Sequence, residues 1–502
     1  MSGARMLGLL ERGWMATETW VAAALLGAAV LIGPYYLVHL PNAGRAGTLA
    51  LLAAGCLLAA VLIGPMGGRL LQRLRAATAG IGAGNGFAFV LAAGVVAQLA
   101  VALLTQPIPN SDGGNYLQLA NDLALGQPYQ DPEGHRAFWP PGFPLVLSPF
   151  VVLAGANLVA VTLCNLFLYL VGVFSARGLG AALFGARTGV IAALLFTFWP
   201  SRLLTAAVAS KENLTIAAVL AGTMLCVRGL QGARLRWGHA AGAGIAFGIA
   251  GLAQPGLLLF VLAMPLCYRH LRGASLWRYF GFSAIVLACA ALALVPWQMR
   301  NCALFEGQFC GVATNGGSVF YRANNPLATG EWTAEGAIPI THLPELEQNR
   351  LGFELGKQWI LANPGDFAIL AAKKLGLLLR DDRYGAYWGV LRGTGFEHTK
   401  AIRLASSERM LAYQVLNTLS WLFWAGVTGL IAHRLIRLGR RGDRATIGRL
   451  LPLLYPLLYS AAVFAVFESD RRQHMMALAL LLVLAAWAIE QGGGEQAPQA
   501  AR

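Results

Sequence analysis

The sequence predicts an all-α polytopic integral membrane protein with about twelve transmembrane helices, and three observations carry this prediction. Of the 502 residues, 57% are hydrophobic and only 12% are charged, whereas soluble chains carry about 25% charged residues because a water-facing surface needs them. Apolar runs long enough to cross about 30 Å of hydrocarbon recur along nearly the whole chain. The short basic loops between these runs fall on one side of the membrane. Soluble enzyme architectures are therefore set aside.

The apolar runs define the expected helices in order. They lie at about 17–40, 48–66, 85–106, 157–176, 188–208, 212–228, 239–254, 255–269, 279–298, 411–434, 450–467 and 473–490. The first run is too long for a signal-peptide core and no clear cleavage site follows it, so it is expected to be a retained anchor. The run 142–155 is expected to be re-entrant or interfacial, because a full crossing there would reverse the side of every later loop.

The net charge of +15 is expected to orient the protein in the membrane and not to bind nucleic acid, because the arginines sit in short clusters between apolar runs. With Arg5 and Arg12 cytoplasmic, the alternate loops hold Arg69, Arg73, Arg75, Arg177, Arg187, Arg228, Arg234, Arg236, Arg269, Arg272, Arg278 and the run from Arg434 to Arg449. The positive-inside rule then places both termini in the cytoplasm and makes 107–141 and 300–410 extracytoplasmic.

These assignments divide the chain into five parts. Two N-terminal transmembrane helices (1–84) precede a catalytic transmembrane core (85–299) that contains the first outer segment. The second outer segment (300–410) is followed by the C-terminal transmembrane helices (411–491) and by a tail, 492–502, whose composition predicts disorder. Neither outer segment is long enough to be an independent enzyme domain. Chemistry is therefore expected where the outer segments meet the ends of the spans.

The two outer segments differ in character. In the first, the pattern predicts a short helix over 113–125 that ends at Gly126, before a proline- and aromatic-rich stretch. In the second it predicts a mixed loop and then an amphipathic helix over 366–380. Cys302 and Cys310 flank a turn on the oxidising side, so they are expected to be either a disulfide across a hairpin or two free thiols.

Two acidic residues at span ends are candidate catalytic groups. Asp112 follows the third span directly, where a carboxylate is partly shielded from water yet within reach of a hydroxyl substrate, as a general base requires. The alternative is that Asp112 only caps the following helix. Glu212, in Ser210-Lys211-Glu212-Asn213, lies between two spans on the same face, either as a functional carboxylate or as a partner of Lys211 in a tight turn.

The cations on the same face are candidate phosphate ligands, because the arginine guanidinium offers a planar fork of donors suited to phosphate oxygens. They are Lys211, Arg300, Arg322, Arg471 and Arg472. The alternative for each is a side chain that merely reaches the membrane interface. The eight histidines are scattered, and the chain has no Walker loop, dinucleotide-binding glycine motif or zinc cysteine pattern. No cofactor and no metal ligand are predicted, and metal dependence is left open.

Taken together, the outer-face motifs resemble the polyprenyl-phosphate-dependent glycosyltransferases of the C-type membrane superfamily, in particular bacterial relatives of the protein O-mannosyltransferases and lipid A aminoarabinose transferases. The residues that carry the resemblance are Asp112, Tyr116, Trp139-Pro140-Pro141-Gly142, Ser210 to Glu212, Pro296-Trp297, Arg300-Asn301, Asn315-Gly316-Gly317, Tyr321, Asn324-Asn325-Pro326, Thr329-Gly330 and Arg471-Arg472. Their order and shared face, more than any single motif, make the match, which covers about residues 85 to 490.

The resemblance implies a sugar donor on a polyprenyl phosphate, a hydroxyl acceptor in the cell envelope, and an active site on the outer face of the plasma membrane. Asp112 matches the first-loop catalytic acid of the family and Glu212 matches its second acidic position, while Tyr116 and the cations would contact the substrates. One departure is Trp139, which stands where the aminoarabinose transferases have a lysine before the proline pair, so that subfamily is disfavoured. The alternatives are a transporter or flippase, and a polymerase or ligase, of lipid-linked saccharides.

Overall fold

A computed structural model describes residues 16–32, 45–231, 235–257, 259–261, 275–391, 406–470 and 472–491. Within these ranges every regular element is a helix and no strand occurs. The predicted all-α class is therefore confirmed. Arg5, Arg12, Arg234, Arg269, Arg272, Arg471 and the tail 492–502 lie outside the described residues.

Six predicted spans coincide with helices long and apolar enough to cross a bilayer. These are α4 (Asn85–Thr105), α7 (Leu158–Phe184), α10 (Lys211–Leu230), α13 (Leu276–Leu304), α18 (Ser407–Arg441) and α19 (Arg444–Val466). A seventh crossing would be α2 (Arg45–Ile63) with α3 (Pro65–Ala77), which are bent by 57° at the break between them.

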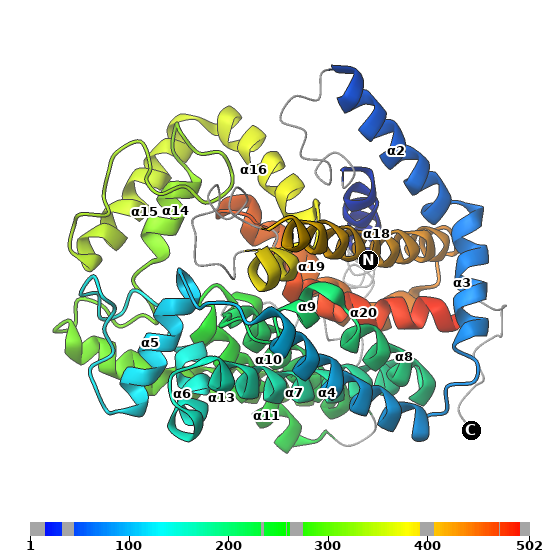
Figure 1. Ribbon diagram of the computed structural model, residues 1–502, viewed down its shortest axis with the longest axis horizontal. Helices are drawn as coiled ribbons and strands as arrows, with labels where there is room; N and C mark the ends of the chain where they lie inside the picture. The colour runs from blue at the N-terminus through cyan, green and yellow to red at the C-terminus, as the bar shows by residue number, and fades with distance from the viewer. Residues whose placement is uncertain are drawn as a thin grey trace.

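The other predicted spans are shorter helices. They are Ala16–Ile32, α8 (Ala186–Thr197) with the five-residue α9 (Pro200–Leu204), α11 (Trp237–Ala253) and α20 (Met475–Glu490). All residues of α20 from Met475 to Ile489 are buried, so this helix runs through the interior of the bundle (Figure 1). Most of the predicted span 255–269 lies outside the described residues, and the count of twelve stays a prediction.

The loop end of the molecule, as we call the end that carries α5, α14, α15 and α16, is built by the two predicted outer segments (Figure 1). The predicted short helix is α5 (Asp112–Ala124), followed by Gly126 at φ 67°, and the predicted amphipathic helix is α16 (Pro364–Leu379). Both predictions are confirmed. The second outer segment also contains the helices α14 (Gly316–Ala323) and the 18-residue α15 (Glu345–Ala362). The expectation of a mixed loop in that segment was therefore wrong.

The helix α6 (Gly142–Ala154) covers the run expected to be re-entrant or interfacial. Its 13 residues make a helix of about 20 Å, which is too short to cross the hydrocarbon core. It begins against α11, where a Cβ on Gly142 would lie 2.3 Å from the Ala253 nitrogen. A partial insertion fits this length, and the re-entrant or interfacial placement stays a prediction.

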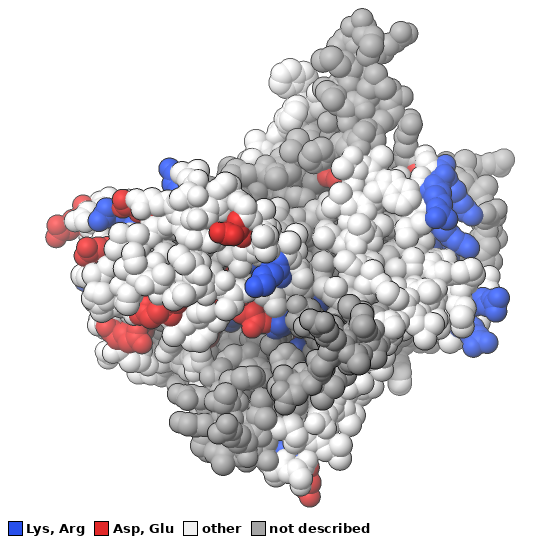
Figure 2. All heavy atoms as spheres, turned by 90° about the horizontal axis from the view of Figure 1, so that it is seen from above, with Lys and Arg blue, Asp and Glu red and all other residues white. Residues whose placement is uncertain are grey.

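Charged side chains separate along the molecule. Figure 2 shows basic side chains gathered at the end where α3 lies, while acidic side chains gather at the loop end. Arg69, Arg73 and Arg75 lie on α3, whereas the first turn of α15 contributes Glu345 and Glu347. This distribution is the one that the positive-inside rule requires if the loop end faces outward.

The two outer segments are fastened to each other. The Glu345 carboxylate accepts hydrogen bonds from the backbone N–H groups of Arg136 and Ala137 at 3.2 to 3.3 Å, and from Thr314 Oγ1 at 3.3 Å. Arg300 donates to the carbonyls of Arg136 at 2.8 Å and Tyr129 at 3.3 Å. The first outer segment is therefore held in place by the second.

The hairpin after α13 is closed by a disulfide between Cys302 and Cys310, whose Cα atoms lie 4.3 Å apart. Of the two arrangements left open by the sequence, the structure shows the bridge. Asn301 Nδ2 donates to the Gly311 carbonyl at 2.8 Å and Trp297 Nε1 to the Val312 carbonyl at 3.0 Å, so the chain after the disulfide packs on the end of α13.

Replacing Cys302 and Cys310 together by serine is expected to lower the free energy of unfolding by about 2 to 3 kcal/mol, the chain-entropy value for so short a closed loop. Thermal unfolding of the detergent-solubilised protein measures this change. Reductant should lower the unfolding midpoint of the wild type and leave that of the double variant unchanged. Cys56→Ser, which removes an exposed free cysteine, is the control. An equal response of wild type and double variant to reductant would contradict the bridge.

Candidate functional site

Asp112 meets Arg472 at the loop end of the bundle. The Arg472 Nη1 lies 2.8 Å from Asp112 Oδ2, and the two residues are 360 positions apart in the sequence. Asp112 is the first residue of α5, and Arg472 lies just before α20. The alternative that Asp112 only caps a helix does not describe this geometry, because the N-cap of α5 is Ser111 and the Asp112 carboxylate is directed to the guanidinium.

The backbone in front of Asp112 is unusual. Ser111 has φ of 51°, in the left-handed region that non-glycine residues rarely adopt. Such conformations persist where the surrounding structure fixes them, and they cluster at functional sites. Gly113 allows the first turn of α5 to approach the chain before α10, since a Cβ there would lie 2.9 Å from the Ala209 carbonyl oxygen.

Glu212 is the second carboxylate that lies beside Arg472. Its Oε1 lies 3.9 Å from Arg472 Nε, and its Oε2 accepts a hydrogen bond from Ser210 Oγ at 2.5 Å. The Tyr384 hydroxyl is 3.2 Å from Ser210 Oγ and 3.5 Å from Glu212 Oε2. Glu212 is buried and held from several directions, whereas the Asp112 side chain keeps 33% of its surface exposed. Asp112 is therefore the carboxylate that a substrate can reach more easily.

These groups line one pocket. The pocket opens to the surface and contains about 430 Å³ of space, its open mouth included. Its lining includes Pro107, Pro109, Asn110, Asp112, Gly113, Tyr116, Ser210, Glu212, Tyr384, Trp388 and Arg472. The pocket thus combines two carboxylates, one guanidinium, hydroxyl groups and an aromatic wall.

The charged groups in the pocket shift one another's pKa values. Burial raises the pKa of Asp112, but the charge and hydrogen bond of Arg472, with a smaller contribution from Lys211, lower it by more, so the pKa lies below its ordinary value of 3.8. Burial lowers the pKa of Arg472, and the carboxylates of Asp112 and Glu212 raise it by more. Asp112 and Arg472 are therefore both charged at neutral pH.

The predicted site residues separate into two groups. Asp112, Tyr116, Glu212 and Arg472 line the pocket. The Tyr116 ring lies 5.7 Å from that of Phe143 in an edge contact. Lys211 begins α10 beside Glu212, and its charge acts on Asp112.

The structure does not bring Arg300 and Arg322 to this cluster, and Arg471 lies outside the described residues. Arg300 is used to hold the first outer segment, where its guanidinium also stacks 4.5 Å above the Trp297 ring. Arg322 lies on α14, with Nη2 3.7 Å from Glu468 Oε2. Sequence position alone could not separate these two arginines from Arg472, because all of them lie at the same end of the molecule.

The sequence analysis missed the run Arg380-Asp381-Asp382-Arg383-Tyr384. All five residues are buried. Arg383 Nη2 lies 2.8 Å from Asp381 Oδ2, and Arg380 pairs with Glu331 and lies 3.5 Å from Asp470. Tyr384, at the end of the run, lines the pocket, and so does Trp388 one turn later. Four consecutive charges in a chain with so few were the signal that could have found it.

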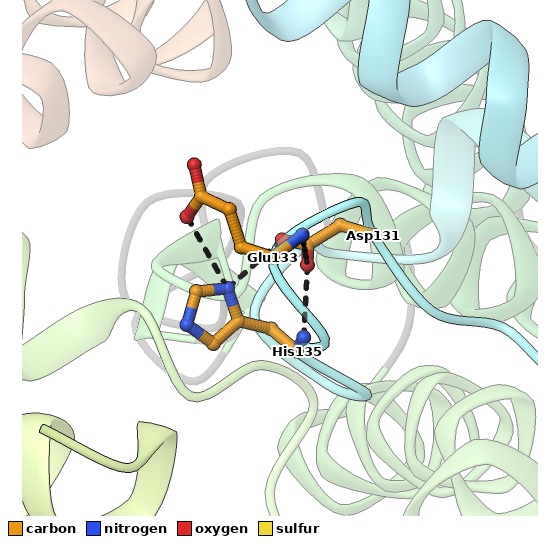
Figure 3. A group of neighbouring side chains, drawn as sticks. All are labelled: Asp131, Glu133 and His135. Carbon is orange, nitrogen blue, oxygen red and sulfur yellow. Dashed lines mark hydrogen bonds and ion pairs between the residues drawn. The ribbon is translucent and has the colours of Figure 1, made fainter. Parts of the chain in front are cut away.

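Asp131, Glu133 and His135 form the one group within the described residues whose ligand atoms could surround a metal ion, all lying within 4.8 Å of one another (Figure 3). The sequence analysis, which predicted no metal ligand, overlooked this group. Asp131 accepts from the backbone N–H groups of Glu133 and His135 and from Trp139 Nε1, and lies 2.9 Å from His135 Nδ1. Its lone pairs are thus already occupied, and the group orders the loop that precedes Trp139.

No protein-family model and no curated protein sequence matches the chain. Among solved structures it is similar to the oligosaccharyltransferase AglB from Archaeoglobus fulgidus, in complex with an inhibitory peptide and a dolichol-phosphate, with 13% sequence identity and a TM-score of 0.45 over 80% of this chain and 50% of that chain. It is also similar to ArnT from Cupriavidus metallidurans bound to undecaprenyl phosphate, with 15% identity and a TM-score of 0.38 over 81% and 78% of the two chains.

This chain therefore spans about half the length of the archaeal protein. At these identities the likeness concerns the arrangement of the helices alone.

Proposed function

We propose that the protein is a membrane glycosyltransferase that moves a sugar from a polyprenyl-phosphate donor to a hydroxyl group of an acceptor at the outer face of the membrane. The observation that carries this proposal is the contact of Asp112 and Glu212 with one shared arginine, Arg472, in a pocket at the ends of the helices. A carboxylate for the acceptor proton and a cation for the leaving phosphate are the two groups that such a transfer needs.

Arg472 would bind the donor phosphate. Its guanidinium already lies between two carboxylates, and phosphate oxygens can accept the same charge-assisted hydrogen bonds from this planar fork of donors. Lys211 adds a second positive charge close by, since its charge acts on both Asp112 and Glu212. Arg300 and Arg322, which the structure places in other contacts, are left out of this role.

Asp112 would act as the general base. The acceptor oxygen attacks the anomeric carbon as the bond from that carbon to the phosphate oxygen breaks; the bonding electrons leave with the polyprenyl phosphate, and the hydroxyl proton moves to Asp112. A single displacement of this kind inverts the anomeric configuration. The leaving phosphate departs without a proton, so no acid partner is needed.

The shared arginine makes the base stronger when the donor is bound. In the free site Arg472, with a smaller contribution from Lys211, lowers the pKa of Asp112 against the raising effect of burial. When the guanidinium turns to the phosphate, its lowering effect weakens and the pKa of Asp112 rises, which favours proton acceptance. Glu212, held by Ser210 and Tyr384, would keep Arg472 within reach of both positions.

Purified protein in proteoliposomes, supplied with a panel of polyprenyl-phosphate monosaccharides and envelope-lipid acceptors, tests the proposal. We expect release of free polyprenyl phosphate together with the appearance of the sugar, in inverted configuration, on an acceptor. Movement of the lipid-linked sugar across the bilayer without release would instead identify a flippase. Transfer of only a complete glycan from a lipid-linked oligosaccharide would identify a polymerase or ligase.

A further inference from the structure

Two residues of the pocket, Tyr384 and Arg472, come from two different segments of the chain. Tyr384 comes from the chain after α16, and Arg472 from the turn before α20. Each of these pocket residues has a neighbour two positions away along the chain. Asp382 precedes Tyr384, and His474 follows Arg472. His474 Nε2 lies 3.4 Å from Asp382 Oδ1, and both side chains are completely buried. This contact therefore joins the segment that carries Tyr384 to the segment that carries Arg472.

Indole rings fix both members of this contact. Trp199 Nε1 donates to Asp382 Oδ2 at 2.5 Å, and the Trp424 ring stacks on the His474 ring at 4.7 Å with an interplanar angle of 24°. Trp424 is itself oriented by a hydrogen bond from Nε1 to the Leu379 carbonyl at 3.0 Å. An indole therefore contacts each member of the pair.

The charged side chains next to Asp382 in the sequence form ion pairs with other residues. Arg380 and Arg383 both reach Asp381 Oδ2, at 3.2 and 2.8 Å, and Arg380 also lies 3.5 Å from Asp470. Of the two adjacent aspartates, Asp381 therefore meets the arginines and Asp382 meets Trp199 and His474. A carboxylate buried without an arginine or lysine costs several kcal/mol in desolvation, so its retention at this place calls for a role.

From this geometry we infer that Asp382 and His474 are a positioning pair that fixes Arg472 and Tyr384 relative to each other, and so sets the phosphate-binding position of the pocket. The inference rests on the proposed function for the identity of the ligand. An arginine that turns between carboxylates and a phosphate needs a fixed backbone, since a displacement of about 1 Å is enough to lose much of a site's effect. Neither member of the pair lines the pocket.

Binding of undecaprenyl phosphate to the full chain in nanodiscs, measured beside thermal unfolding, tests the pair. His474→Leu and Asp382→Asn should each raise the Kd about tenfold, while His474→Gln, which keeps a donor, should retain most of the affinity. The double variant Asp382→Asn/His474→Leu should bind no more weakly than the weaker single variant, because the two residues act as one unit.

Lys374→Met is the matched control. Lys374 is equally buried in the same outer segment, donates from Nζ to the Val466 carbonyl at 2.9 Å at the end of α19, and does not line the pocket. This variant should lower the unfolding midpoint without changing the Kd. The inference is overturned if the Kd follows the unfolding midpoint across all variants, Lys374→Met included, or if the single effects add in the double variant.

A second measurement keeps the inference apart from the proposed function. Backbone hydrogen exchange over 467–474 should be faster in Asp382→Asn and His474→Leu than in the wild type, with or without lipid. Unchanged exchange there would overturn the positioning role. Failure of the wild type to bind undecaprenyl phosphate, with faster exchange in the variants, would instead count against the proposed donor alone.

Discussion

Asp112→Asn is expected to reduce the rate of sugar transfer by about 10²- to 10⁴-fold, the range for loss of a positioned general base. Asparagine has the shape of aspartate and can still accept a hydrogen bond from Arg472, so the pocket should keep its form. It cannot take up the acceptor proton. The effect should therefore appear in kcat, with little change in the KM for the donor. Initial rates of polyprenyl phosphate release measure both constants.

Asp122→Asn provides a control on the same helix, because Asp122 lies on α5 ten residues after Asp112 and does not line the pocket. It should transfer at the wild-type rate. Glu212→Gln should be impaired less in kcat than Asp112→Asn, since Glu212 is held by Ser210 and Tyr384 and is more buried. Near-normal transfer by Asp112→Asn would remove this residue from the mechanism.

Arg472→Gln is expected to weaken binding of polyprenyl phosphate by about 30-fold or more, which corresponds to about 2 kcal/mol for lost charge-assisted hydrogen bonds. It also leaves Asp112 and Glu212 as neighbouring carboxylates without their shared cation, so the unfolding midpoint should fall. The double variant Arg472→Gln/Glu212→Gln should recover part of this stability and none of the binding. Titration with undecaprenyl phosphate and thermal unfolding measure the two effects.

The pH dependence should change with the same substitution. The pKa of Asp112 lies below 3.8 in the wild type, so its contribution to stability is present above that pH and is lost as the pH falls through the lowered pKa. Removal of Arg472 leaves burial as the main cause of the shift and should raise this pKa. The acid limb of kcat/KM due to Asp112 should therefore lie at higher pH in Arg472→Gln than in the wild type.

Arg322→Gln is the comparison for Arg472→Gln, because Arg322 is also an arginine at the loop end with a carboxylate partner, Glu468. Its loss should affect stability and leave donor binding unchanged. Equal loss of binding in both variants would show that the phosphate site extends to α14. Unchanged binding in Arg472→Gln would exclude Arg472 as the phosphate ligand.

The helices of the second outer segment show where pattern reasoning succeeds and where it fails. The apolar face of α16 and its start at Asn363-Pro364 predicted that helix well. The helix α15 was missed because it is polar on most sides, although its residues from Glu345 to Ala362 are mostly good helix formers that follow Pro344. Hydrophobic periodicity detects helices that bury a face in the core, and α15 buries only a narrow strip of residues.

The environment of each segment could be predicted from local composition: an all-helical membrane protein, basic residues at one end, and Asp112 and Glu212 at span ends. Run length and the scarcity of charge are enough for this, since each depends on local composition. Which charges meet depends on how the helices pack. The tertiary structure brought Arg472 to Asp112, turned Arg300 and Arg322 to other contacts, and delivered Tyr384 through a buried run of four charges. Hydropathy reports whether a residue is in lipid or water, whereas its partner depends on how helices distant in sequence pack together.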